Sequence, residues 1–299
     1  MTHFFEKNKY YLSLFGAALC YTLLVLSSAY LSKIHINLFE QVFWRLLLGT
    51  LFAGLICAFQ SDFKIEKREI QYLLINTFIF LAAFITFAGG IALGTPIAKA
   101  VALNYSYPLI VIFLSYLLFK ELPALKHLIA IIISLLSVGL LIEVWKIKNL
   151  SQIELGDFVA WLNSWFYGAI LVFGRKLRLS TNLKPFKTIF YSHLFALPLL
   201  FMVSFIFVFF DTQFLAIQIH LDFSFQNWLI IIVSTFFGSI APLALIYIAI
   251  SKVKPVIASL ILLTEPLWVY IGGLLFFDQS LSLMPLIGIF GIISAVLLI

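Results

Sequence analysis

Apolar segments about twenty residues long recur along the whole chain, separated by short polar breaks. A helix of this length crosses roughly 30 Å of hydrocarbon, because each residue adds ~1.5 Å to it. Of the 299 residues, 63% are apolar and only 11% are charged, a mixture that the surface of a soluble domain does not tolerate. The sequence therefore predicts an all-α integral membrane protein.

Charged clusters and Pro or Gly residues mark the ends of the predicted spans. The spans are ten transmembrane helices, at residues 10–32, 37–59, 69–92, 96–119, 124–143, 155–174, 186–210, 226–249, 255–276 and 281–299. Few residues remain outside them, so no soluble domain is expected. The two cysteines, Cys20 and Cys57, fall inside spans, which argues against a disulfide or a metal site.

The distribution of Lys and Arg predicts the orientation in the membrane. With the N-terminus in the cytoplasm, fourteen basic residues fall in cytoplasmic segments and only four, Lys33, Lys99, Lys146 and Lys148, on the other side. We therefore expect a multi-pass protein of the plasma membrane, a bacterial inner membrane, with both termini cytoplasmic. The net charge of +6 forms no continuous basic stripe, so no nucleic-acid partner is expected.

An internal repeat emerges when residues 106–141 are laid on residues 264–299 at a shift of 158, where eleven of thirty-six positions are identical. The informative matches are Pro108 with Pro266 and Phe119 with Phe277, because they align a mid-span proline and then a loop. Each half holds five spans, an odd number, so the second copy enters the membrane from the opposite side. We predict two inverted five-helix repeats, residues 1–148 and 149–299.

Two segments resemble the helix 4 and helix 9 signatures of the drug/metabolite transporter superfamily, in its EamA-like ten-helix members. They are "AVALNYSYPLIVIFLSYLLFKEL" from Ala100 to Leu122 and "SLILLTEPLWVYIGGLLFFDQSL" from Ser259 to Leu281. The first copy keeps the acidic residue Glu121 after the fourth helix, whereas the second copy has Gln279 there. The resemblance implies a secondary carrier that moves amino acids, nucleosides or related metabolites by alternating access, without ATP hydrolysis.

The strongest candidate for a binding residue is Glu265, near the middle of the ninth span. An ionised carboxylate there costs at least a few kcal/mol unless it is paired or faces water. Pro266 follows it and leaves the carbonyl of Leu262 without a helical donor, as Pro108 does for the carbonyl of Asn104 in the fourth span. Helices broken at equivalent depth in both halves indicate a central transport site. A structural kink with a buried carboxyl is the alternative.

Several polar residues share a face with these breaks. Asn104 and Tyr107 are three residues apart on one helix face, as are Glu265 and Trp268 on another. An aromatic plane beside an acid suits a cation or an aromatic ring. The alternative for each of them is a hydrogen bond or a packing contact that holds helices together.

Trp44 and Arg45 lie about a third of the way into the second span. At this depth Arg45 needs an anionic partner, and Glu265, an anionic group of the substrate and another acid all stay open. Lys99 lies nearer the end of its span, so we expect its amine to snorkel to the interface.

The remaining candidates lie on the sixth and seventh spans. Asn163 and Tyr167 are four residues apart and share a helix face. This face either lines the transport cavity or packs against another helix. His193 is a candidate proton carrier, because histidine titrates near neutral pH, and a hydrogen-bonded structural role is the alternative.

The sequence holds no nucleotide-binding glycine loop, zinc-ligand cluster or nucleophile with a base; Gly89–Gly90 and Gly272–Gly273 predict close helix packing. We expect no catalytic residues, no metal and no cofactor. The expected partners are a small-molecule substrate and the lipid bilayer, and whether protons are coupled to transport stays open. The chain is expected to be a monomer or a weak dimer. The function predicted is a secondary active transporter, an exporter or exchanger. The alternatives are a membrane-embedded enzyme acting on a lipid-linked substrate and a passive channel.

Overall fold

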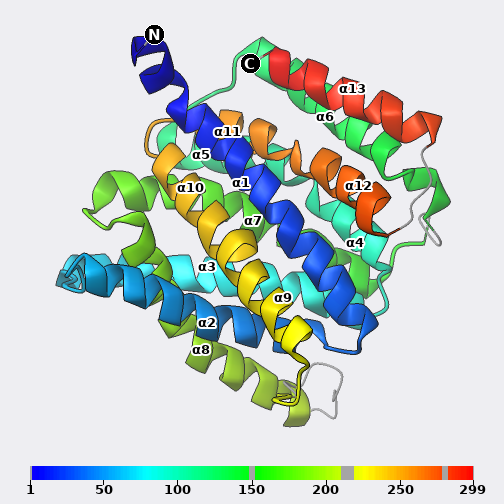
Figure 1. Cartoon of the computed structure of the whole chain (residues 1–299). Coiled ribbons are helices and arrows are strands. Elements are labelled where there is room, and N and C mark those ends of the chain that lie inside the picture. Colours follow the sequence, from blue (N-terminus) through cyan, green and yellow to red (C-terminus); the bar gives the residue numbers. More distant parts are fainter. Residues whose placement is uncertain (1, 148–151, 210–218, 278–281, 299) are drawn as a thin grey trace.

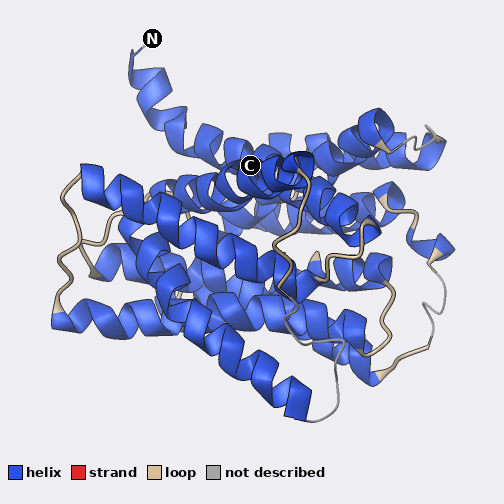
Figure 2. Ribbon diagram, turned by 60° about the horizontal axis from the view of Figure 1, so that its bottom comes forward, coloured by secondary structure: helices blue, strands red, loops and turns tan. Residues whose placement is uncertain are grey.

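The computed structural model describes residues 2–147, 152–209, 219–277 and 282–298, in which every regular element is a helix (Figures 1 and 2). The elements are α1 (Thr2–Lys33), α2 (Leu38–Phe59), α3 (Lys67–Ala92), α4 (Ile97–Asn104), α5 (Tyr107–Phe119), α6 (Leu125–Leu141), the short 3-10 helix η1 (Val144–Lys146), α7 (Leu155–Ser180), α8 (Pro185–Phe209), α9 (Phe225–Thr235), the π-helical turn η3 (Phe236–Ile240), α10 (Ala241–Ala249), α11 (Pro255–Leu262), α12 (Glu265–Phe276) and α13 (Leu283–Leu297).

Eight helical regions of the described chain are long and apolar enough to cross a membrane, and α6 and α13 are shorter apolar helices. These ten regions coincide with the ten predicted spans, so the predicted fold class is confirmed. The boundary of the sixth span was placed too early, since α7 continues from the predicted end at residue 174 to Ser180. The additional turns carry Arg175, Lys176 and Arg178, which are good helix formers although they end the apolar stretch.

Several helices of each half pack against helices of the other half. α1 packs against α9, η3 and α10 of the second half, and α7, the first helix of the second half, packs against α3 of the first. The helices α2 and α8 pair with each other, as do α6 and α13, which lie along one edge of the molecule in Figure 1. Each half therefore buries its first helix against the third span of the other, as inverted repeats related by a pseudo-two-fold axis do.

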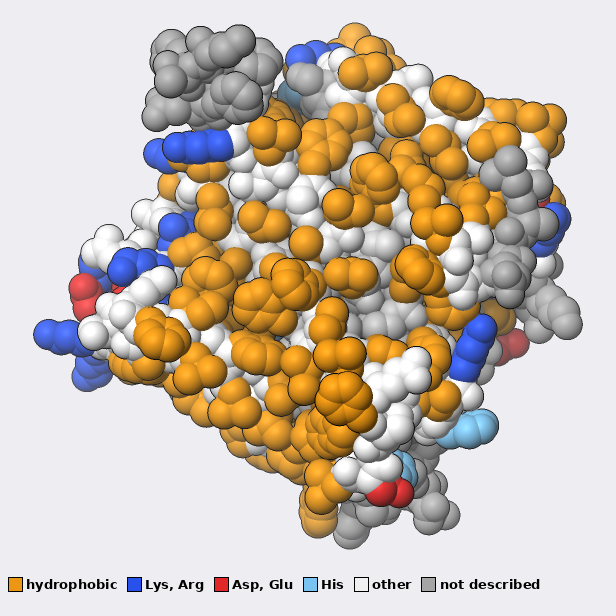
Figure 3. Space-filling view, in the orientation of Figure 1, with side chains coloured by type: hydrophobic (Ala, Val, Ile, Leu, Met, Phe, Trp, Pro, Cys, Tyr) orange, Lys and Arg blue, Asp and Glu red, His pale blue; other side chains and the backbone are white. Residues whose placement is uncertain are grey.

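The surface carries a broad apolar area. Phe59, Leu136 and Phe205 are 89%, 67% and 72% exposed. In Figure 3 hydrophobic side chains cover most of the face, while Lys and Arg lie along its borders. A face of this size and polarity suits contact with lipid.

Close approach of α3 and α7 depends on a glycine. A Cβ added at Gly90 would lie 2.6 Å from the Cβ and 2.7 Å from the backbone N of Ala160, whereas one at Gly89 would meet Val159 Cγ1 at an ordinary 3.6 Å. The close packing predicted for this glycine pair is therefore confirmed at Gly90.

The two glycines provide a matched pair of variants. Gly90→Ala should lower the free energy of unfolding by about 1–3 kcal/mol, because the α7 backbone must move away to admit the methyl group. Gly89→Ala should be neutral or slightly stabilising, since alanine favours the helix. Thermal unfolding of both variants in one detergent checks this, and equal melting temperatures would contradict it.

Candidate functional site

Two spans are each divided into two helices at corresponding positions, α4 from α5 and α11 from α12. The cause is Pro108 and Pro266, which cannot donate a backbone hydrogen bond and whose rings crowd the preceding turn. Both breaks lie near the middle of their spans, which run from Ile97 to Phe119 and from Pro255 to Phe276. The predicted helix breaks are therefore confirmed.

Near each of the two breaks, a backbone carbonyl accepts a hydrogen bond from a side-chain hydroxyl three residues later in the chain. The Ser106 hydroxyl donates to the Leu103 carbonyl at 2.7 Å, and the Thr264 hydroxyl donates to the Ile261 carbonyl at 2.8 Å. Ser106 and Thr264 correspond at the repeat shift of 158, as their acceptors do. The two copies thus keep the same local geometry although few residues in them are identical.

Glu265 is the first residue of α12, and Tyr107, its equivalent in the repeat, is the first residue of α5. The N-terminus of a helix carries partial positive charge, which favours a carboxylate in the first turn. The repeat thus provides two equivalent central positions, and one of them carries an acid.

Four tyrosines from both halves lie within electrostatic range of Glu265: Tyr21 on α1, Tyr105 between α4 and α5, Tyr107 on α5 and Tyr167 on α7. The Tyr107 and Tyr167 rings meet edge to face with centroids 4.8 Å apart. We call Glu265 and these four tyrosines the Glu265 box. Tyrosine faces and hydroxyls beside a carboxylate suit a ligand with a positive charge.

The Tyr107 hydroxyl also links the two halves directly. It donates to the backbone carbonyl of Ser259 on α11 at 3.0 Å. The Tyr107 ring is buried, so this hydrogen bond is shielded from solvent. The box therefore spans the interface between the repeats.

No counter-charge for Glu265 is found in the described part of the chain. Among the described residues, no Lys, Arg or His forms an ion pair with it. Its side chain remains partly exposed, although Pro266 and Leu267 beside it are buried. A carboxylate held here without a partner is available to a cationic group or a proton.

Two further polar atoms adjoin the box and have no hydrogen-bond partner among the described residues. They are Oδ1 of Asn104, at the end of α4, and Nε1 of Trp268, one turn after Glu265. Both atoms are buried, where an unpaired acceptor or donor costs about 1–3 kcal/mol. They are one acceptor and one donor whose hydrogen bonds the described residues do not supply.

Arg45 does not pair with Glu265. Its Nη2 donates to Ser28 Oγ at 2.7 Å and to Gln41 Oε1 at 3.4 Å, and no described acid forms an ion pair with it. The neighbouring Trp44 is buried, with its ring 4.9 Å from that of Trp228. Of the three partners left open for Arg45, Glu265 is thus excluded in this structure, and the described contacts of its guanidinium are with neutral groups.

Two other candidates make hydrogen bonds or ring contacts with helix residues outside the box. Asn163 donates from Nδ2 to the Ala83 carbonyl of α3 and so ties α3 to α7. His193 is 1% exposed, its Nδ1 bonds the Ile189 carbonyl at 2.9 Å, and its ring packs against Phe80. These contacts agree with the structural alternatives given above, which were helix packing for Asn163 and a hydrogen-bonded structural role for His193.

The sequence reasoning missed Tyr21, Tyr105 and Ser259. Tyr21 lies at the middle of the first span, Asn8–Lys33, and Tyr105 lies at the first helix break. Depth in the span could have indicated both residues, whereas Ser259 contributes only its backbone carbonyl, for which no side-chain signal exists.

The expectation that Lys99 snorkels to the interface was wrong. Its side chain is 7% exposed and its Nζ lies 2.7 Å from Asp157 Oδ2. Thr95 donates to the other oxygen of Asp157 at 3.0 Å. The start of α4 is thereby fixed to the start of α7.

A second acid, Glu40, lies at the start of α2 and holds the segment before α9. Its carboxylate is buried and accepts from the backbone N of His220 at 2.7 Å, from His220 Nδ1 at 2.9 Å and from Trp44 Nε1 at 3.4 Å. The hydrogen bond that His220 donates to Glu40, together with the charges of Glu40 and Asp222, raises the pKa of His220 above its ordinary value.

This contact predicts a pH-dependent contribution to stability. Protonated His220 binds Glu40 best, so the contribution is complete below the unfolded pKa of about 6.5 and is lost as the pH rises through the raised folded pKa. His220→Ala should therefore lower the melting temperature more at about pH 6 than at about pH 9. Glu40→Gln should abolish this difference, and a His220→Ala effect that does not change with pH would contradict the assignment.

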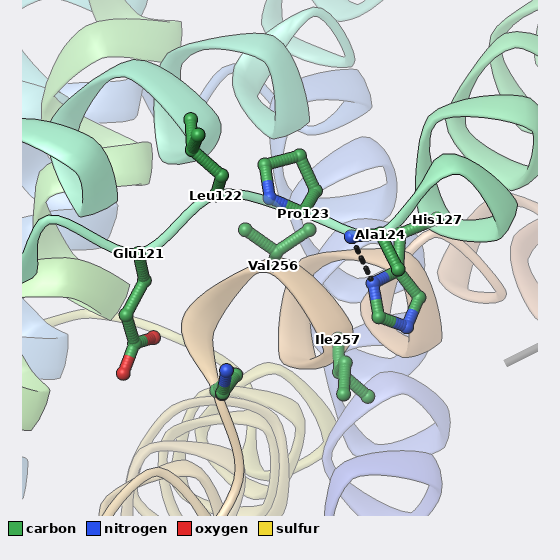
Figure 4. A pocket seen from close by; sticks show the side chains of 8 residues that line it. Glu121, Leu122, Pro123, Ala124, His127, Val256 and Ile257 are labelled. Atoms are coloured by element: carbon green, nitrogen blue, oxygen red, sulfur yellow. Dashed lines mark hydrogen bonds between the residues drawn. The ribbon is translucent and has the colours of Figure 1, made fainter.

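A pocket of about 130 Å³ lies where the connection from α5 to α6 meets the start of α11 (Figure 4). It is lined by Glu121, Leu122, Pro123, Ala124, His127, Lys254, Val256 and Ile257. Glu121 pairs with Arg175 at 2.8 Å, and His127 Nδ1 accepts the Ala124 N–H that is dashed in Figure 4. Two of its polar groups are thus already engaged, and the pocket lies at the ends of the broken spans, after α5 and at the start of α11, and not at their central breaks.

Comparison with solved structures supports the fold. A structure described as "Crystal structure of protein" matches with a TM-score of 0.78 and 13% sequence identity, covering 97% of this chain and 96% of that one. Identity at this level shows a shared fold alone. No curated protein matches the chain.

The sequence also matches the EamA-like transporter family twice, over residues 8–142 and residues 154–299. Each match covers one five-helix half, and together they account for nearly the whole chain. The two broken spans lie one in each match, at Pro108 and Pro266. The chain therefore belongs to the EamA-like transporter family, within the drug/metabolite transporter superfamily.

Proposed function

We propose that this protein is a secondary active transporter that exports or exchanges a small polar metabolite, such as an amino acid, a nucleoside or a derivative. The observation that carries the proposal is Glu265, an unpaired acid at a helix break, surrounded by tyrosines from both halves. Broken helices at mid-depth in inverted repeats are a general feature of the substrate sites of secondary transporters.

Alternating access is supported by the composition of the box. Tyr21, Tyr105 and Tyr107 belong to the first half, and Tyr167 and Glu265 to the second. A rocking movement of one half against the other opens such an interface first to one side and then to the other. The bond from Tyr107 to the Ser259 carbonyl crosses this interface and would have to break or shift during the movement.

The fourteen basic residues on the side of the termini support a cytoplasmic location for both ends, in a bacterial inner membrane. Coupling to protons follows from the same acid, because a carboxylate that has released a cation binds a proton instead. Export then runs with proton entry, or one metabolite exchanges for another.

The test is counterflow of radiolabelled amino acids and nucleosides into liposomes that contain the purified protein and excess unlabelled compound. We expect accumulation of at least one compound, which protein-free liposomes do not show. Currents through single open molecules in a planar bilayer would favour the channel instead. Turnover of a lipid-linked substrate without any counterflow would favour the enzyme.

A further inference from the structure

Arg45 is a second charge inside the helix bundle that pairs with no acid in the part of the chain that the structure describes. It is the eighth residue of α2, and both its hydrogen-bond partners, Ser28 and Gln41, are neutral. A guanidinium has five N–H donors, and the two bonds from Nη2 leave three for another ligand. The nearest acid on the same helix, Glu40, is engaged by His220 and Trp44.

The two unpaired charges lie along the same face of α1. Arg45 bonds Ser28 on α1, and α12, which begins at Glu265, packs against α1, whose Tyr21 belongs to the buried cluster that Trp268 of α12 contacts. Tyr21 and Ser28 are seven residues apart on α1 and share one face, because seven residues make about two helical turns. Their separation along the axis is roughly 10 Å, at ~1.5 Å per residue.

Along α1, Arg45 therefore lies nearer than the Glu265 box to the end of the helix at Lys33. Arg45 and Glu265 form no ion pair, so neither neutralises the other. A ligand with a single charge would leave one of them uncompensated, which is unfavourable inside a membrane. A ligand with both charges, correctly spaced, would compensate both.

We propose that the substrate is an extended amphoteric molecule, with a cationic group for the Glu265 box and an anionic group, a carboxylate or a phosphate, for Arg45. The inference rests on the proposed function and narrows its substrate class. The offset of roughly 10 Å between Tyr21 and Ser28 along α1 favours an extended molecule over a simple α-amino acid, whose ammonium and carboxylate groups are attached to the same carbon atom. Tyrosine rings lie beside the cationic end.

The test measures ligand affinity by thermal shift and calorimetry on the purified full-length protein. The probes are glycine, ω-aminohexanoate, ω-aminooctanoate, the corresponding ω-aminophosphonates, and hexylamine and hexanoate as compounds with a single charge. We expect the longer amphoteric compounds to bind at least tenfold more tightly than glycine, hexylamine or hexanoate. Comparing the affinities of the ω-aminocarboxylates and the ω-aminophosphonates then identifies the preferred anionic group.

Arg45→Gln should weaken the amphoteric compounds at least tenfold and leave hexylamine unchanged, and Arg45→Lys should restore part of the affinity. Three results would overturn the inference. The amphoteric compounds could bind no more tightly than the single-charge compounds, or they could fail to bind, or the Arg45→Gln variant could bind them with unchanged affinity. If Glu265→Gln abolishes transport while Arg45→Gln changes nothing, this inference fails and the carrier proposal stands. If Glu265→Gln also leaves transport intact, the site itself is wrong.

Discussion

Glu265→Gln is expected to reduce transport at least a hundredfold while the protein stays folded. The amide cannot neutralise a cationic group of the substrate, and losing one partner of a buried charge pair costs about 3–5 kcal/mol, or roughly two to three and a half powers of ten in affinity. Counterflow in liposomes measures the loss. The melting temperature of the ligand-free variant should equal or exceed that of the wild type, because a charge without a partner has been removed from the bundle.

A matched control is Glu66→Gln, which changes an exposed acid before α3 that pairs with Arg68 at 2.7 Å. Its side chain is 52% exposed, so the substitution should leave transport within twofold of the wild type. A Glu265→Gln protein that keeps more than half of the wild-type rate would exclude the acid from substrate binding.

Breaking the Lys99–Asp157 pair should cause the largest loss of stability. Lys99→Met leaves Asp157 buried and charged, and Asp157→Asn leaves Lys99 in the same state, so each should lower the free energy of unfolding by about 3–5 kcal/mol. The double variant should recover most of this loss, because no charge then remains unpaired. Reversible unfolding in mixed detergent micelles measures all three.

The exposed pair of Lys146 and Glu143 provides the control. Its nitrogen–oxygen distance of 2.8 Å is close to that of the buried pair, but the lysine side chain is 63% exposed. Lys146→Met should change the unfolding free energy by less than about 1 kcal/mol. A similar loss in Lys99→Met and Lys146→Met would show that burial is not the cause.

Features with a local cause could be predicted from the sequence. Span positions follow from apolar length, and the two helix breaks follow from Pro108 and Pro266, whose effect on the backbone needs no distant partner. The inverted arrangement followed from the odd number of spans in each half. Among the proposed site residues, Glu265 and Tyr107 were found because a proline marks each of them.

Partners between distant segments could not be predicted. Lys99 and Asp157 are on different halves, and depth alone favoured snorkelling over an ion pair. Tyr21 reaches the box only because α1 packs against the second half, which the apolar pattern of α1 does not encode. The π-helical turn η3, before Pro242, also lacked a pattern of its own, although Gly238 within it lies against the backbone of Leu24.

The duplicated breaks differ in one respect, since the position of Glu265 in the second half is occupied by Tyr107 in the first. Under the proposed function this asymmetry sets a stoichiometry. One carboxylate holds one positive charge at a time, so a cationic cargo and a proton exclude each other at the centre. Each complete cycle of exchange would then carry one positive charge outward and one inward at this acid, which makes the exchange at this position electrically neutral.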